Sequence, residues 1–144
     1  MSAAAAPFFS VIVATYNWSS ALALALSSVL DQTEPDFELL VIGDACTDDS
    51  EAVVVALNDR RIRWVNLDSN CGSQWGPNSV GLSMARGRLV AYLGHDDLWA
   101  PRHLEAARRC FDATHAEVLA AGCLLYGPPT SGLRALTGFF PNDR

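Results

Sequence analysis

Short apolar runs alternate with amphipathic segments along most of the chain. Three runs rich in β-branched and aromatic residues predict strands buried on both faces: residues 8–14 (FFSVIVA), 37–42 (FELLVI) and 89–93 (LVAYL). A fourth run, residues 62–67 (IRWVNL), alternates apolar and polar positions and is typical of an edge strand or a strand with one exposed face. A further strand is expected over residues 117–126 (EVLAAGCLLY).

The segments between these runs predict helices. Leu22, Leu26, Val29 and Leu30 recur at helical spacing after a serine cap at Ser19 or Ser20. Three more helices are expected: from a Thr47 cap to Asn58, from Pro77 to about residue 85, and from Pro101 to about residue 113. The repeated strand–helix order predicts an α/β fold, a mostly parallel, Rossmann-like sheet flanked by helices on both faces.

Polar clusters directly follow three of the predicted strands. Residues 15–17 follow the first strand, Asp44 follows the second, and residues 95–97 follow the strand over 89–93. Right-handed crossovers bring the carboxyl ends of parallel strands to one edge of the sheet, where open α/β sheets bind ligands. The sequence therefore predicts a binding site made of these clusters.

Two adjacent carboxylates, Asp96 and Asp97, end the run at 89–93. Paired carboxylates suit a hard divalent cation, and such a cation suits a nucleoside diphosphate. The alternative is that both side chains cap the helix expected after them. His95 is read as a solvent-facing loop residue, while Trp75 and Trp99 are candidates to line a cleft.

Composition narrows the class of protein further. A length of 144 residues indicates one domain, and the net charge of −6 argues against a nucleic-acid backbone as partner. No run of about 18 apolar residues predicts a membrane span, and the alanine-rich start has no basic region typical of a signal peptide. We therefore expect a cytoplasmic location, with a place at the inner membrane surface open to a longer parent protein. Residues 1–7 are expected to be disordered, and residues 128–144 show no clear period.

Several motifs together resemble the nucleotide-binding half of family 2 glycosyltransferases, which have the A-type glycosyltransferase fold. The resemblance covers roughly residues 8–126, and the motifs keep the order and spacing usual in the family. It implies a donor-binding domain over residues 8–127. The matching motifs are VIVATYN (11–17), SSVLDQT (27–33), FELLVIGD (37–44) with T-D (47–48), N-C-G (70–72), A-R-G (85–87) and LGHDDLW (93–99) with the proline at 101.

The resemblance implies a nucleotide-binding role for the residues after the first two strands. Asp44 would accept a hydrogen bond from the base of a sugar nucleotide, and a UDP-sugar is favoured. Tyr16 would lie against that base, although a tyrosine after a strand often only packs. Thr15 and Asn17 would help to shape the pocket.

The resemblance also implies a metal site that contacts the diphosphate. Asp97 would be the nearest ligand of Mg²⁺ or Mn²⁺, and Asp96 would hold the ribose or a metal-bound water. The metal would stabilise the charge of the leaving diphosphate. Asn70 and Gly72 belong to a predicted turn near the diphosphate, and an ordinary turn is the equal alternative.

The chain departs from the family pattern at several positions. Gly43 stands in place of the first of two acidic residues, and Gly94 in place of the first aspartate of D-x-D-D. The middle helix reads G-P-N at 76–78, so the arginine expected to face the phosphates is missing there. Arg86 or Arg63 would have to substitute for it, or nothing does.

These observations predict an inverting, metal-dependent transfer of a sugar from a nucleoside-diphosphate sugar to a hydroxyl acceptor. The chain would cover mainly the donor-binding half, with 128–144 the start of a missing acceptor-binding part. The general base is not identifiable, because nothing marks Asp112, Glu117 or Asp143. The donor sugar, the acceptor and the oligomeric state are also left open.

Rival functions are separated by particular features of the sequence. A degenerate module of the same fold, used for nucleotide or protein binding, is the main alternative. A nucleotidyltransferase would need a glycine-rich, basic loop after the first strand, and a dinucleotide-binding domain would need G-x-G-x-x-G there. Neither is present in residues 11–17.

Overall fold

The computed structural model describes residues 5–121, 123–126 and 133–136. Strands and helices alternate through the first 114 residues, as the sequence predicts. The elements are β1 (Phe9–Thr15), α1 (Ser19–Leu30), β2 (Phe37–Gly43), α2 (Ser50–Ala56), β3 (Ile62–Asn66), α3 (Trp75–Met84), β4 (Leu89–Gly94), α4 (His103–Thr114), β5 (Cys123–Tyr126) and β6 (Leu133–Leu136).

The first four strands form one parallel sheet in the order β3-β2-β1-β4. Every residue of β1 and β2 is buried, which confirms the two strands predicted to be buried on both faces. β3 lies at an edge of the sheet, which is one of the two arrangements predicted for it. The prediction for 89–93 is wrong in one respect: β4 lies at the other edge of this sheet, where Tyr92 is 51% exposed. An apolar run cannot reveal whether a neighbouring strand covers its outer edge.

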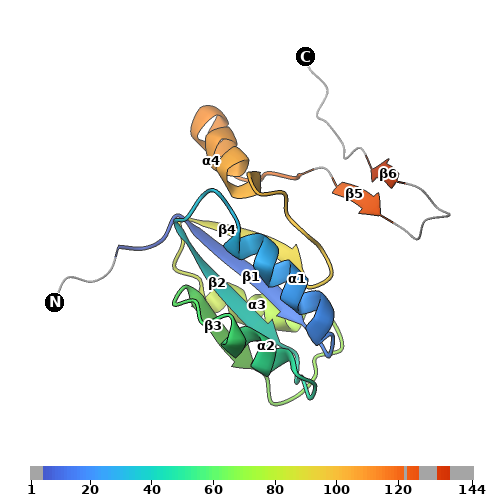
Figure 1. Cartoon of the computed structure of the whole chain (residues 1–144). Coiled ribbons are helices and arrows are strands. Elements are labelled where there is room, and N and C mark those ends of the chain that lie inside the picture. The colour runs from blue at the N-terminus through green and yellow to red at the C-terminus, as the bar shows by residue number, and fades with distance from the viewer. Residues whose placement is uncertain (1–4, 122, 127–132, 137–144) are drawn as a thin grey trace. The chain divides into compact units, whose positions relative to one another are not determined.

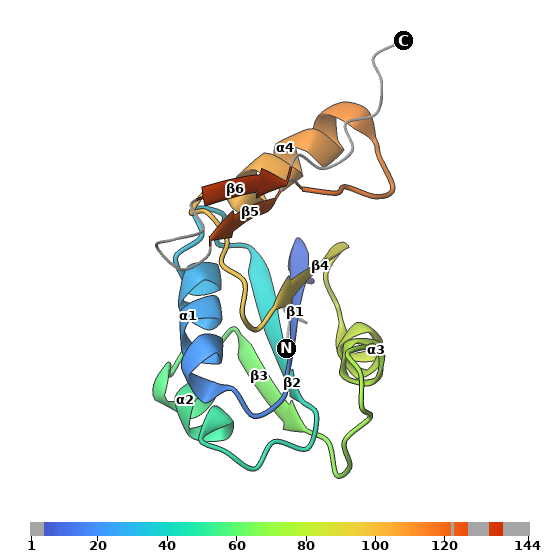
Figure 2. The same cartoon turned by 90° about the vertical axis from the view of Figure 1, so that its right-hand side faces the viewer.

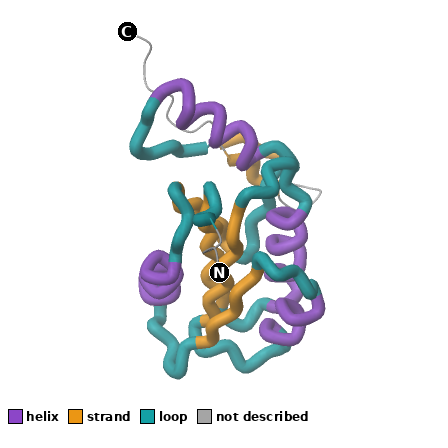
Figure 3. Tube along the Cα trace, turned by 90° about the vertical axis from the view of Figure 1, so that its left-hand side faces the viewer, coloured by secondary structure: helices purple, strands orange, loops and turns teal. Residues whose placement is uncertain are grey.

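Helices cover both faces of the sheet, as expected for a Rossmann-like fold. Figure 1 and Figure 2 show α1 and α2 on one face and α3 on the other, with the strands between them. The tube in Figure 3 shows the same three layers from the opposite side. Ile12, Leu40 and Ile42 are fully buried under Val80 and Met84 of α3. Burying each such side chain contributes about 1.5–3 kcal/mol, so this layer anchors the sheet.

Two helix starts differ from the predictions because proline does not always occupy the first helical position. α3 begins at Trp75, two residues before Pro77. Proline is tolerated there because the N–H groups of the first turn have no partner within the helix. α4 begins at His103, after a turn in which the N–H of His103 donates to the carbonyl of Ala100 at 3.0 Å.

The chain divides into two compact units, residues 1–105 and 106–144. In the second unit β5 and β6 pair as an antiparallel hairpin, with Cys123 opposite Leu136. The strand expected over 117–126 is shorter than predicted, since residues 117–121 are not in a strand, and β6 falls in the segment without a clear period. Residues 1–4, 122, 127–132 and 137–144 lie outside the description, so the prediction of disorder for 1–7 concerns mostly undescribed residues. Within the described part, no helix is long and apolar enough to cross a membrane.

Candidate functional site

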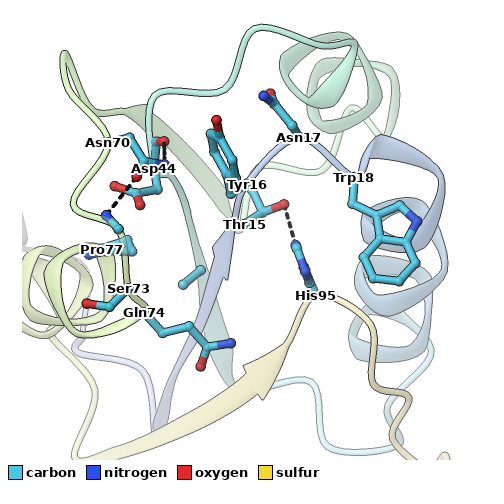
Figure 4. A pocket seen from close by; sticks show the side chains of 12 residues that line it. Thr15, Tyr16, Asn17, Trp18, Asp44, Asn70, Ser73, Gln74, Pro77 and His95 are labelled. Atoms are coloured by element: carbon cyan, nitrogen blue, oxygen red, sulfur yellow. Dashed lines mark hydrogen bonds between the residues drawn. The ribbon is translucent and has the colours of Figure 1, made fainter.

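A pocket of about 440 Å³ opens at the carboxyl ends of β1, β2 and β4 (Figure 4). This volume falls in the range of about 300–1,000 Å³ that is usual for small-molecule sites. Residues from all three predicted strand-end clusters meet here, but from the third cluster only His95 lines the pocket. The lining residues are Ala14, Thr15, Tyr16, Asn17, Trp18, Asp44, Asn70, Gly72, Ser73, Gln74, Pro77 and His95.

Asp44 fixes the side of the pocket formed by the loop after β3. Its side chain is only 5% exposed, and its Oδ1 accepts a hydrogen bond from the backbone N–H of Cys71 at 2.8 Å. The Asn70 amide donates to the carbonyl of Asp44 at 3.1 Å and accepts from the N–H of Gly72 at 2.7 Å. The predicted turn at Asn70 and Gly72 is therefore present, with Gly72 at a φ of 70°, and it forms part of the pocket wall.

The Asp44 carboxylate also affects the neighbouring thiol. The hydrogen bond with the Asp44 side chain raises the pKa of the Cys71 thiol, and desolvation acts in the same direction. The thiol also lies against Gly76, where an added Cβ would overlap it. Glycine at position 76 thus allows the loop after β3 to pack closely on the start of α3.

Thr15 and His95 join the ends of β1 and β4. The Thr15 hydroxyl and Nδ1 of His95 are 2.8 Å apart and share a hydrogen bond. The His95 ring also meets the Trp18 ring edge-to-face, with the centroids 5.6 Å apart and the planes at 84°. His95 lies in a turn, as expected, but the interpretation that it faces solvent is wrong in part, because the residue is half-buried and both contacts hold its ring at the pocket.

Asn17 ties the loop after β1 to the loop after β2. Its Oδ1 accepts hydrogen bonds from the backbone N–H groups of Thr47 and Asp48, at 2.8 and 3.3 Å. Asn17 adopts a φ of 46°, in the left-handed region that asparagine tolerates better than most residues. The side chain therefore orders the two loops at the pocket's edge.

Asp48, and not Thr47 as predicted, satisfies the start of α2. Its Oδ1 accepts from the backbone N–H and the hydroxyl of Ser50, while its Oδ2 accepts from the N–H of Ser19 at the start of α1. Partial burial opposes ionisation of Asp48, but these hydrogen bonds outweigh it and lower the pKa of the carboxyl. One carboxylate thus serves the N-termini of two helices.

The aromatic residues of the pocket differ from those suggested by the sequence. Tyr16 is 51% exposed and lines the pocket, so its ring is accessible to a ligand. Trp75 is 70% exposed and does not line the pocket. Trp99 does not line it either, and its ring stacks on that of His103 with the centroids 4.5 Å apart. Trp18 supplies the indole instead. Trp18 comes three residues after the end of β1, and this position in the sequence could have indicated that it lines the pocket.

Asp96 and Asp97 are exposed and lie in a turn over residues 94–97 that also contains His95, where the N–H of Asp97 donates to the carbonyl of Gly94 at 3.1 Å. They do not line the pocket, and they do not cap α4, which begins at His103. Both carboxylates approach Gly94: a Cβ added there would lie 2.7 Å from Oδ2 of Asp97 and 3.1 Å from Oδ1 of Asp96. The two side chains therefore occupy the space that an aspartate at position 94 would need.

The carboxylate oxygens of Asp96 and Asp97 are of the kind that a divalent cation takes, but two side chains alone do not complete its coordination. Mg²⁺ is commonly bound by one or two carboxylates together with phosphate oxygens and waters. Within the described residues no group of three or more His, Cys, Asp or Glu side chains could hold an ion alone. An ion at this turn would therefore need further oxygens from a bound ligand or from water.

Neither Arg86 nor Arg63 replaces the missing phosphate-facing arginine. Arg86 donates to the buried Glu38 carboxylate at 2.7 Å, and Arg63 lies 3.8 Å from the same carboxylate. Glu38 is the second residue of β2, at the amino end of the strand and away from the pocket. Among the described residues that line the pocket, none is lysine or arginine.

The structure explains why position 43 is glycine and what Gln32 of the SSVLDQT motif contacts. A Cβ on Gly43 would lie 2.5 Å from Oδ1 of Asn66 and 2.6 Å from the Trp64 ring, so the acidic residue common at this position has no room. The Gln32 amide donates to the carbonyl of Ala100 at 2.8 Å and accepts from the N–H of Leu104 at 2.9 Å. It thereby holds the segment that follows the two carboxylates.

Comparison with known proteins gives consistent matches. The family model described as "Glycosyl transferase family 2" matches residues 10–139. The glucosyltransferase WfgD of Escherichia coli, named for UDP-Glc and α-D-GlcNAc-diphosphoundecaprenol, is 34% identical over 67% of this chain and 38% of its own length. The chain spans about a third of the length of curated relatives that it matches.

Solved structures share the fold. Staphylococcus aureus TarS 1–349, in complex with UDP-GlcNAc, superposes with a TM-score of 0.72 and 31% identity over 74% of this chain and 32% of that one. The mannosyltransferase PcManGT of Pyrobaculum calidifontis, in complex with GDP-Man and Mn²⁺, gives a TM-score of 0.63 and 25% identity, covering 72% of this chain and 31% of that one.

Proposed function

The chain belongs to glycosyltransferase family 2, and on this basis we propose that it forms the donor-binding part of an inverting, metal-dependent sugar transferase. The enzyme would move a sugar from a nucleoside-diphosphate sugar to a hydroxyl acceptor. The observation that carries the proposal is the position of the 440 Å³ pocket, which ends at His95, directly before the two exposed carboxylates.

The base of the nucleotide would lie beside Asp44 and Tyr16. Asp44 is buried at the end of β2 and a carboxylate has about four lone-pair sites, so it can accept from Cys71 and from a base N–H together. The exposed Tyr16 ring offers a flat apolar surface for stacking. Thr15, Asn17, Asn70 and Gly72 complete this part of the pocket. A uracil base is favoured, in keeping with relatives named for or solved with UDP-sugars.

The diphosphate would be held with a cation at the turn after β4. Asp97 would be the nearest protein ligand of Mg²⁺ or Mn²⁺, and Asp96 would contact the ribose or a metal-bound water. When bound, the cation supplies positive charge that stabilises the leaving diphosphate. A structural relative solved with both GDP-Man and Mn²⁺ supports the use of a metal ion.

The acceptor hydroxyl would attack the anomeric carbon from the side opposite the diphosphate, after a general base takes its proton. We assign neither acceptor binding nor the base to a described residue. Asp112 and Glu117 are exposed, with no feature that marks a base, and Asp143 lies outside the described residues. The name of WfgD, with its polyprenol-linked substrate, supports a place in envelope or polysaccharide synthesis at the inner membrane surface.

The main alternative is a degenerate module that keeps the fold but has lost transfer activity. Two observations favour it: Gly94 provides no carboxylate, and no lysine or arginine is found among the described lining residues. This module would bind nucleotides weakly or only bind other proteins.

Calorimetric titration of UDP into the chain, first with Mn²⁺ and then with EDTA, tests the proposal. Saturable binding that requires Mn²⁺ is the expected result, and a parallel titration of GDP identifies the preferred base. Absence of binding for both nucleotides, with and without Mn²⁺, would reject the donor site and favour the degenerate module.

A further inference from the structure

His95 stands between the two parts of the proposed donor site. It lines the pocket with Asp44, and the two residues that follow it are the exposed carboxylates. Figure 4 shows Asp44 and His95 on either side of Thr15, which is hydrogen-bonded to both. A nucleotide that extends from Asp44 to Asp97 would therefore bring its phosphates close to His95.

The His95 ring is oriented by contacts that use only one of its nitrogens. Nδ1 shares the hydrogen bond with Thr15, and the edge-to-face contact with Trp18 fixes the plane of the imidazole ring. Within the described residues, Nε2 of His95 has no hydrogen-bond partner. Every buried side-chain nitrogen or oxygen of the described residues does have a partner. Nε2 is therefore not buried and is accessible to a ligand. Because a hydroxyl can donate as well as accept, Thr15 can donate to Nδ1 and leave the ring proton on Nε2.

The pocket needs such a donor because it has few groups that attract phosphate. Its described lining contains no lysine or arginine, and the two arginines considered from the sequence, Arg63 and Arg86, lie at Glu38, away from the pocket. The net charge of −6 adds no attraction for an anion. Besides amide and hydroxyl groups, the described lining side chains with a ring N–H are the Trp18 indole and the His95 imidazole, and only His95 directly precedes the two carboxylates.

We propose that His95 donates a hydrogen bond from Nε2 to a diphosphate oxygen of the sugar nucleotide. This inference rests on the proposed donor site and adds a binding residue to it. In this arrangement Thr15 lines the pocket and also holds Nδ1 of His95, so that Nε2 faces the ligand.

Three variants separate this role from a purely structural one. Glutamine can place an amide N–H near the position of Nε2, whereas asparagine can replace only Nδ1. Calorimetry with uridine, UMP and UDP at fixed Mn²⁺ would compare His95→Gln, His95→Asn and His95→Ala with the wild type. His115→Asn is the matched control, because His115 is exposed, lies outside the pocket lining and has a φ of 54° that asparagine tolerates. Thermal melting of each variant checks that it folds.

The expected result is a loss of UDP affinity of about tenfold or more in His95→Asn and His95→Ala, since a hydrogen bond to a charged group is lost. His95→Gln should retain most of the affinity, and uridine should bind all variants alike. Equal UDP binding by folded His95→Ala, equal losses for uridine and UDP, or retention by asparagine but not glutamine would each overturn the proposal. If the wild type binds uridine and UDP in Mn²⁺ but the variants do not differ, only His95 is rejected. If the wild type binds no nucleotide, the donor site itself is rejected.

Discussion

Arg86 donates two side-chain hydrogen bonds to one oxygen of Glu38, from Nε at 3.0 Å and from Nη2 at 2.7 Å. Its backbone N–H donates to the other oxygen at 2.7 Å, and the Ser10 hydroxyl donates there as well. Glu38 is only 3% exposed, so these donors are what allow a charged carboxylate inside the sheet. The arginine of the A-R-G motif is thus a structural residue that joins the loop before β4 to β1 and β2.

Replacement of Glu38 by glutamine should lower the free energy of unfolding by about 2 kcal/mol at pH 7, because charged hydrogen bonds to a buried group are lost. Urea denaturation measures the difference. Glu51→Gln, on the exposed first turn of α2, is the control and should change stability much less. A loss as small as that of the control would show that the cluster contributes little.

The Glu38 contribution should also depend on pH. Burial opposes its ionisation, but hydrogen bonds from Arg86 and Ser10 outweigh this and hold the pKa of Glu38 below its usual value. The stabilisation is therefore present above the unfolded-state pKa of about 4.3 and is lost as the pH falls through the lower pKa of the folded state. The stability gap between wild type and Glu38→Gln should shrink below about pH 4. A constant gap from pH 7 to pH 3 would contradict this.

Asp48→Ala should destabilise the chain by about 1–2 kcal/mol, because the starts of α1 and α2 lose a shared acceptor. Asp48→Asn, which keeps an acceptor oxygen, should lose less. Thermal unfolding of both variants tests the prediction. Equal losses in alanine and asparagine would indicate that charge, and not the hydrogen bonds, stabilises these helix starts.

Asp44→Asn should weaken UDP binding by about tenfold while the loop after β3 stays in place, because the amide oxygen can still accept from the N–H of Cys71. Asp112→Asn, an exposed substitution on α4, serves as the control. Calorimetry gives both affinities. Unchanged binding in Asp44→Asn would remove the base contact from the proposed site.

Asp97→Ala should abolish the Mn²⁺-dependent part of UDP binding without loss of fold, since the side chain is exposed and makes no described side-chain hydrogen bond. The affinity in Mn²⁺ should fall to the value measured in EDTA. Asp112→Ala should bind as the wild type does. If Asp97→Ala keeps the full Mn²⁺ effect, the metal assignment is wrong.

The order of strands and helices and the edge that carries the pocket could be predicted from the sequence. Burial on both faces leaves uninterrupted apolar runs in β1 and β2, and right-handed crossovers do not depend on side-chain detail. The positions of Thr15, Asp44 and His95 at one edge follow from these two facts alone.

The partners of individual polar side chains could not be predicted. Arg86 finds Glu38 across 48 positions, and its role depends on which end of the sheet the loop before β4 reaches. The same holds for Asp48, whose second partner is Ser19 on another helix. Edge exposure of β4 is likewise decided by its neighbours, which a local pattern does not encode.

The loops around the pocket, which form its rim, are joined by hydrogen bonds before any ligand binds. Thr15 holds His95, Asn17 holds Thr47, and Asp44 holds Cys71, so segments after all four parallel strands are joined in pairs. When a ligand binds to this rim, the loops lose little conformational entropy, because they are already ordered when the chain folds. Substitutions in different loops should consequently be non-additive in double-mutant cycles, and the rim should respond to a ligand as one cooperative unit.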